Sequence, residues 1–227
     1  GIVHNGLSLE DAPFEPERDD ALCFVGRVTP EKGIVEAIEI ATRAGRALRI
    51  AAKAGPSAAE REYFETVFAP ALQAAGRSVE YLGELSGSDR DQLFAQSYAS
   101  LMPGSWPEPF GLVAIESLAC GTPIIARRIG ALPEIIRDGV DGFFGDDVAA
   151  MAGAVERVDG LDRAAIRASV IERFSATRMT DGYEDVYARR LAGSGPDDRD
   201  NSVKSFIPPG RLRLRREGRR ARLADAS

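Results

Sequence analysis

The sequence predicts an α/β protein with a Rossmann-like open parallel sheet and helices on both faces. Short apolar runs recur along the chain, each bounded by Gly, Pro or Ser and each too short for a helix. They lack the strict alternation of strands that face water on one side, which indicates strands covered on both faces. Segments with apolar residues at helical spacing separate the runs. This repeated β–α–β order builds a parallel sheet with right-handed crossovers.

The elements follow one another in a regular order. Ser88 and Asp89 are candidate N-caps of the third helix, and Asp146-Asp147 has the character of an N-cap before the last part of the chain, which is helical only. The expected strands are residues 22–25, 48–52, 79–82, 100–102, 123–126 and 142–144. The expected helix faces comprise Ile34, Ala37, Ile38 and Ala41, then Tyr63, Phe64, Val67 and Phe68, then Leu93, Phe94 and Ser97, and after Asp147 three further stripes, the last with Met179, Tyr183, Val186 and Tyr187.

Composition excludes several classes of function. The 227 residues suffice for one sizeable domain, and the net charge of −6 argues against a general role on nucleic acid or on a membrane surface. Cys23 and Cys120 each lie in an apolar stretch and are expected to be buried thiols. A single histidine, His4, excludes a His-rich metal site, and no apolar run is long enough to span a bilayer.

The chain divides into a folded part and a tail. Residues 1–191 are expected to form the folded domain, and residues 192–227 a linker with a basic, disordered tail. From Lys204 onward the tail carries eight basic and two acidic residues, so it is either a solvated tail or an arm for an anionic lipid or polymer. Because the chain opens inside a loop with the turn signal Asn5-Gly6, we interpret it as lacking an N-terminal part.

One loop with two cations follows the first predicted strand. It runs over residues 26–33 and is neither a dinucleotide fingerprint nor a P-loop. Arg27 offers a planar fork for phosphate oxygens, and Lys32 a compact positive charge five residues on. The spacing alone leaves open that they are two surface cations on a turn.

A second loop, before the helix expected after residue 111, is also suited to an anion. Gly111 allows the helix to begin close to a ligand, and the free N–H groups of Leu112 and Val113 would bind phosphate. Glu116, one to two turns into that helix, leans toward its N-terminus and could accept hydrogen bonds from two neighbouring hydroxyls. Glu108 on the loop would stand nearer the reacting group.

Six stretches in series carry a family resemblance over residues 2–191. They are "HNGLSLEDAPF", "FVGRVTPEKG", "EYLGELS", "EPFGLVAIESLACGTPIIA", "GALPEIIRDGVDGFF" and "YEDVYARRL". The chain thereby resembles the C-terminal, donor-binding domain of retaining glycosyltransferases of the GT-B fold, of the GT4-like type called glycosyl transferases group 1. The resemblance implies transfer of a sugar from a nucleotide-diphosphate sugar to an acceptor, and an N-terminal acceptor domain that this chain lacks.

The resemblance also implies a role for each matching residue. Glu108 is expected near the hydroxyls of the donor sugar, and Glu116, with seven residues between them, on the nucleotide ribose. Arg27 and Lys32 would bind the diphosphate and stabilise it as the leaving group. The remaining matches are Gly26 at the close approach of the first loop, Phe110, Gly111, Leu112 and Val113 as the segment that holds sugar and phosphate, and Tyr81, Leu82 and Leu85 where the base docks.

The resemblance implies retention of the anomeric configuration without a metal or cofactor, in the cytoplasm or at the periphery of a membrane. The isolated domain is expected to bind nucleotide weakly and to transfer little sugar. Two alternatives stay open at this point. One is an enzyme like the nucleotide-sugar epimerases, and the other is a non-catalytic module that binds nucleotide.

Overall fold

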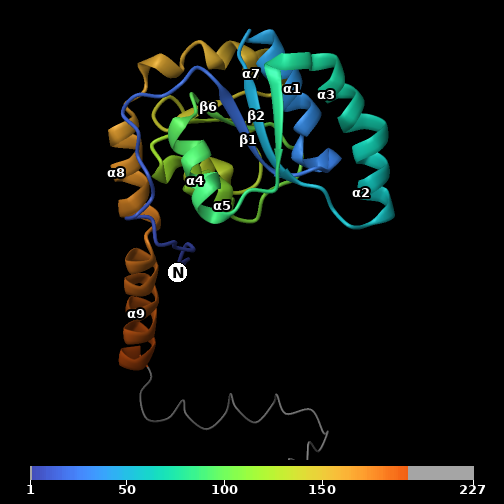
Figure 1. Cartoon of the computed structure of the whole chain (residues 1–227). Helices are drawn as coiled ribbons and strands as arrows, with labels where there is room; N and C mark the ends of the chain where they lie inside the picture. The colour runs from blue at the N-terminus through green and yellow to red at the C-terminus, as the bar shows by residue number, and fades with distance from the viewer. Residues whose placement is uncertain (1, 194–227) are drawn as a thin grey trace, which may run out of the picture. The chain divides into compact units, whose positions relative to one another are not determined.

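The computed structural model describes residues 2–193, and its centre is one six-stranded sheet (Figure 1). The strand order is β3-β2-β1-β4-β5-β6, and every pairing is parallel. The predicted fold class and all six predicted strands are confirmed. The strands are β1 Leu22–Arg27, β2 Leu48–Lys53, β3 Val79–Gly83, β4 Ser100–Met102, β5 Ile124–Ala126 and β6 Gly142–Phe144.

Helices cover both faces of this sheet, as predicted (Figure 1). On one face α1 packs against α3 and α7, and their apolar stripes close the larger core over β1 and β2. On the other face α5 packs against α4 and α8. The helices are α1 Ile34–Arg43, α2 Ala58–Tyr63, the π-helical η2 Phe64–Phe68, α3 Ala69–Ala75, α4 Gly87–Gln96, α5 Leu112–Ala119, α6 Leu132–Ile135, α7 Val148–Val155, α8 Arg163–Phe174 and α9 Ala176–Gly193, with 3-10 turns η1 Pro30–Lys32, η3 Gly76–Ser78 and η4 Val158–Gly160.

The strand order places a crevice between β1 and β4. The chain moves from β1 outward to β3 on one side, and then returns to build β4 to β6 on the other. The connections that leave β1 and β4 therefore diverge to opposite faces of the sheet. Open α/β sheets bind ligands at this switch point, beyond the carboxyl ends of the strands.

Two predicted helix starts have different outcomes. Asp147 is the N-cap of α7, since its side chain accepts a hydrogen bond from the N–H of Ala150. The prediction of Ser88 or Asp89 as N-cap of α4 is wrong, because the cap is Ser86, and its hydroxyl donates to the Asp89 carboxylate at 2.7 Å. Helix α4 thus begins two residues earlier than the apolar spacing indicated.

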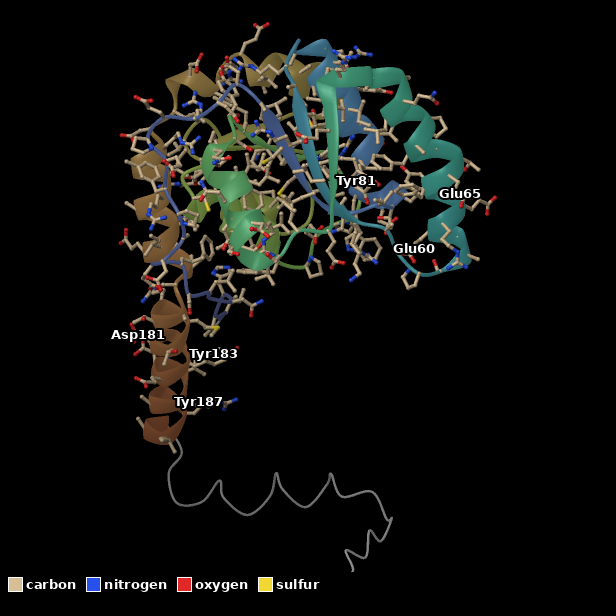
Figure 2. All side chains as sticks on the ribbon, in the orientation of Figure 1. Glu60, Glu65, Tyr81, Asp181, Tyr183 and Tyr187 are labelled. Atoms are coloured by element: carbon tan, nitrogen blue, oxygen red, sulfur yellow. The ribbon has the colours of Figure 1, made fainter. Side chains whose placement is uncertain are left out.

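The compact unit extends to Glu184, and the rest of α9, from Asp185, belongs to a second unit. On α9, Tyr183 is 44% and Tyr187 is 63% exposed (Figure 2). Helix α9 runs to Gly193, two residues past the predicted boundary of the linker, and the rest of the predicted tail lies outside the described residues. No helix within residues 2–193 is long and apolar enough to cross a membrane.

Both cysteines are buried free thiols, as predicted. Cys23 on β1 and Cys120 at the end of α5 belong to the same cluster of apolar side chains. Burial raises the pKa of Cys23 to about 11 and that of Cys120 to about 12. Neither thiol is therefore a nucleophile near neutral pH.

A buried arginine joins the ends of two helices that lead to the crevice. Arg163, the first residue of α8, is only 6% exposed. Its guanidinium donates to the carbonyl oxygens of Ala95 at 2.7 Å and Ser97 at 2.8 Å, at the end of α4, and to the Thr122 hydroxyl at 3.1 Å, just after α5. Burial lowers the pKa of Arg163 to about 10. This one side chain therefore fixes how the C-terminal ends of α4 and α5 approach each other.

We predict that Arg163→Met destabilises the fold by about 2–4 kcal/mol, because several buried oxygens lose their donor at once. The free energy of unfolding in urea measures this loss. Arg43→Met is the matched control, since Arg43 is exposed on α1. Equal stability of the two variants would show that the buried guanidinium does not join the helices energetically.

Candidate functional site

A cavity of about 350 Å³ lies at the switch point between β1 and β4. Its floor comes from the ends of these two strands, and its walls from the loops that follow them. The lining residues include Gly26, Lys32, Glu108, Phe110, Gly111, Leu112 and Val113, all predicted for the site, together with Asn5, Glu31 and Trp106. Seven predicted residues from two distant segments of the sequence, 26–32 and 108–113, thus line the same cavity.

The first wall is the turn after β1. Pro30 begins a short 3-10 turn that ends at Lys32, and Gly33 closes it with a positive φ of 72°. A Cβ on Gly33 would lie 2.9 Å from the backbone nitrogen of Gly104, so the two loops touch through their glycines. The ammonium of Lys32 thereby reaches across the cavity and forms an ion pair with the carboxylate of Glu108.

The second wall is the loop of residues 103–111 after β4. The Glu31 carbonyl accepts hydrogen bonds from the N–H groups of Ser105 at 3.0 Å and Trp106 at 3.3 Å, which joins this loop to the first turn. Further along, the Glu108 carbonyl accepts from Ala131 at 2.9 Å. The backbone on both sides of the cavity is therefore held by hydrogen bonds, and only the side chains are free to rearrange.

Helix α5 begins at the edge of the cavity. Its N-cap, Gly111, has a positive φ of 92°, which favours glycine. The N–H groups of Leu112 and Val113 lie in the first turn and have no partner within the helix. Since both residues line the cavity, these donors and the positive end of the helix are available to an anion there.

Glu116 does not line this cavity. It lies on α5, one turn beyond Leu112, and borders a second hollow of about 240 Å³ beside residues 7–12. Its carboxylate forms an ion pair with Arg90 of α4 at 2.9 Å, and its side chain is 19% exposed. Burial raises the pKa of Glu116, while the positive charge of Arg90 acts against this shift.

Arg27 also stands outside the cavity. Its guanidinium lies 3.7 Å from the carboxylate of Glu31 and 3.9 Å from that of Glu60, a residue of α2 (Figure 2). The side chain is 56% exposed, so these ion pairs are weak and easily exchanged. Of the two predicted cations, the structure places Lys32 in the cavity and Arg27 near its edge at the end of β1.

The three residues expected near the base are not among those that line the cavity. The Tyr81 hydroxyl donates to the Ala52 carbonyl at 2.9 Å, and its ring packs edge-on against Phe68 on the side covered by α2 and α3 (Figure 2). Leu82 and Leu85 pack against the cluster that contains the two cysteines. The side chains of Tyr81, Leu82 and Leu85 are partly buried and pack against the core.

Sequence reasoning missed two residues at the site. Trp106 lines the cavity and is 53% exposed. It lies between two prolines in a loop, where no helical or strand periodicity in the sequence could have indicated its position. Arg90, the partner of Glu116, lies in the first turn of α4 and matches no motif in the sequence that would single it out. Within residues 2–193 no three His, Cys, Asp or Glu side chains are placed to hold a metal ion.

Comparison with known proteins gives a consistent result. Residues 9–161 match the family described as glycosyl transferases group 1. A D-inositol 3-phosphate glycosyltransferase of Salinispora arenicola is 32% identical over 203 residues, which are 80% of this chain and 44% of that protein. The Mycobacterium leprae protein of the same name is 34% identical over 206 residues, 85% of this chain and 46% of its own. The chain thus spans just under half the length of these curated relatives.

Solved structures share the fold. The crystal structure of AviGT4, a glycosyltransferase of avilamycin A biosynthesis, has a TM-score of 0.69 at 28% identity, covering 85% of this chain and 58% of that one. Anabaena HepE in complex with UDP and glucose also has a TM-score of 0.69, at 19% identity, covering 83% and 56%. At 19% identity the second likeness concerns the fold alone.

We predict that Gly104→Ala separates the two walls of the cavity and destabilises the fold by about 1–3 kcal/mol. The added Cβ would lie 2.7 Å from the Glu31 carbonyl oxygen, so the backbones must move apart. Gly153→Ala is the control, because its Cβ meets nothing within 4 Å on α7, and alanine is favoured there by about 0.5–1 kcal/mol. Chemical denaturation measures both. Wild-type stability of Gly104→Ala would contradict the close approach.

Proposed function

The chain belongs to the glycosyl transferases group 1 family, and on that premise we propose that it binds the donor of a retaining sugar transfer, a nucleotide-diphosphate sugar. The observation that carries the proposal is the shared cavity of Lys32, Glu108 and the start of α5 at the switch point of the sheet. A cation, a carboxylate and free N–H groups in one hollow suit a ligand with both phosphate and hydroxyl groups.

The diphosphate would lie between Lys32 and the N-terminus of α5. Both carry positive charge at the cavity edge, and a phosphate there would replace Glu108 as the partner of the Lys32 ammonium. Arg27 would turn from its two carboxylate partners, Glu31 and Glu60, to the same phosphate group. As the bond from sugar to diphosphate breaks, negative charge grows on the leaving group, and these donors stabilise it more than the ground state.

The sugar would occupy the rest of the cavity beside Glu108, Phe110 and Gly111. Glu108, released from Lys32 by the phosphate, would accept hydrogen bonds from sugar hydroxyls. The ribose would lie over the first turns of α5, with Glu116 as its acceptor. The backbone after β3, near Leu85, would face the base. HepE, which shares the fold, has been crystallised with UDP and glucose.

Transfer itself needs an acceptor, and we assign the acceptor site to a second domain. The relatives are about twice as long as the segment that matches, which supports this assignment. The same proposal includes retention of the anomeric configuration, a reaction without a metal or cofactor, and a cytoplasmic location. The basic stretch after Lys204, proposed to contact a membrane or a polymer, lies outside the residues that the structure describes.

We expect the chain to bind at least one of UDP, GDP and ADP in calorimetric titrations. Lys32→Ala should weaken binding by about 10- to 100-fold, because a charge-assisted contact to phosphate is lost, and Arg27→Ala should also weaken it. Arg43→Ala removes an exposed cation of α1 and should have no effect. No heat with any of the three nucleotides would defeat the proposal.

The role of Glu116 is tested by comparing two ligands. Glu116→Ala should weaken binding of the nucleoside diphosphate by about tenfold, since a charged acceptor for the ribose is removed. Binding of inorganic pyrophosphate, which has no ribose, should be nearly unchanged. Equal losses for both ligands would contradict the ribose assignment.

A further inference from the structure

Glu116 has an unexpected partner inside the chain. The Arg90 guanidinium of α4 lies 2.9 Å from the Glu116 carboxylate of α5 and 3.3 Å from that of its own neighbour Asp91, both through the same terminal nitrogen. The Arg90 side chain is 30% exposed and that of Glu116 19%, so water screens this pair less than the pairs of Arg27. The pair connects α4 with α5, the helices that follow β3 and β4.

The stability of the fold does not account for this arginine. Arg90 closes the first turn of α4, where the positive end of the helix disfavours a cation. Its Nε is buried and has no hydrogen-bond partner among the described residues, which costs free energy. A half-buried ion pair is often no more stable than well-packed apolar side chains at the same place. The arrangement therefore calls for a role other than packing.

Resting on the proposed function, we propose that Arg90 is a positioning residue for the nucleotide: its ion pair fixes the orientation of the Glu116 carboxylate for two ribose hydroxyls. A carboxylate held from one side by a guanidinium keeps lone pairs free on the other side. Since α5 begins at the phosphate, a fixed Glu116 sets the distance between ribose and diphosphate. Arg90 itself touches neither.

The surroundings of Glu116 define a pH response. Burial raises its pKa, Asp91 raises it further, and Arg90 opposes both. Binding to ribose uses the ionised carboxylate, so affinity is retained above this pKa and lost as the pH falls through it. Removing Arg90 moves that loss to higher pH. The charged groups that face Glu116 or border its hollow are Arg90 and Asp91 from α4, Asp11 from the loop of residues 7–12, and Arg167 of α8, which donates to the carbonyls of Ala12 and Ala119.

The test uses the nucleoside diphosphate that the wild-type chain binds most tightly, titrated between pH 5 and pH 8. Arg90→Met should weaken binding about tenfold at neutral pH and raise the pH at which affinity falls, because the positive charge that opposes the raised pKa of Glu116 is lost. Arg90→Lys should restore part of both. Asp91→Asn, which removes the opposing charge, should move the fall to lower pH. Pyrophosphate binding by all three variants should follow the wild type.

Each other outcome contradicts the inference. An equal loss for pyrophosphate would make Arg90 a phosphate ligand, and tighter nucleotide binding by Arg90→Met would make it a competitor of the ribose. An unchanged pH response in Arg90→Met and Asp91→Asn, with normal binding by the wild type, overturns the inference and leaves the proposed function standing. No nucleotide binding by the wild type overturns both. Melting temperatures of the variants separate these effects from misfolding.

Discussion

The site depends on the close approach of two backbones, the turn after β1 and the loop after β4. Glycine at positions 33 and 104 lets them touch, and the Glu31 carbonyl joins them through two N–H groups. This contact decides where Lys32 and Glu108 can reach, because both side chains start from the joined segments. A parallel sheet with its switch point between β1 and β4 brings these segments together, and the glycines allow the close approach, since a Cβ would lie 2.9 Å from backbone at Gly33 and 2.7 Å at Gly104.

The same order of strands explains what the sequence could predict. Each strand is a short apolar run covered on both faces, so its position follows from composition, and the parallel order follows from the helices between the runs. The cavity residues at 32, 108 and 111–113 could be named because they follow strand ends or open a helix, whereas Gly26 and Phe110 were expected there only from the family resemblance. What sequence patterns could not supply is the partner of each charge, since ion pairs such as Arg90 with Glu116 join residues from separate helices.

The start of α4 shows one limit of sequence patterns. Ser86 caps α4 ahead of the apolar positions because a cap is chosen by backbone geometry, and apolar spacing marks only the buried turns that follow. Tyr81 shows a second limit: it lies on the edge strand β3, its hydroxyl satisfies the Ala52 carbonyl, and its ring packs against the core.

The two glutamates that frame the start of α5 differ in how their charge is balanced. Glu108 is paired with Lys32, a cation inside the cavity, so a phosphate that takes over the lysine frees this carboxylate for another partner. Glu116 is paired with Arg90, which lines the second hollow and not the first, so an anion in the cavity leaves that pair intact. With the proposed donor, Glu108 would become available only when the phosphate is bound, while Glu116 would be ready beforehand. This order would couple recognition of the sugar to the presence of the diphosphate, because Glu108 would accept hydroxyls at full strength only after Lys32 had exchanged partners.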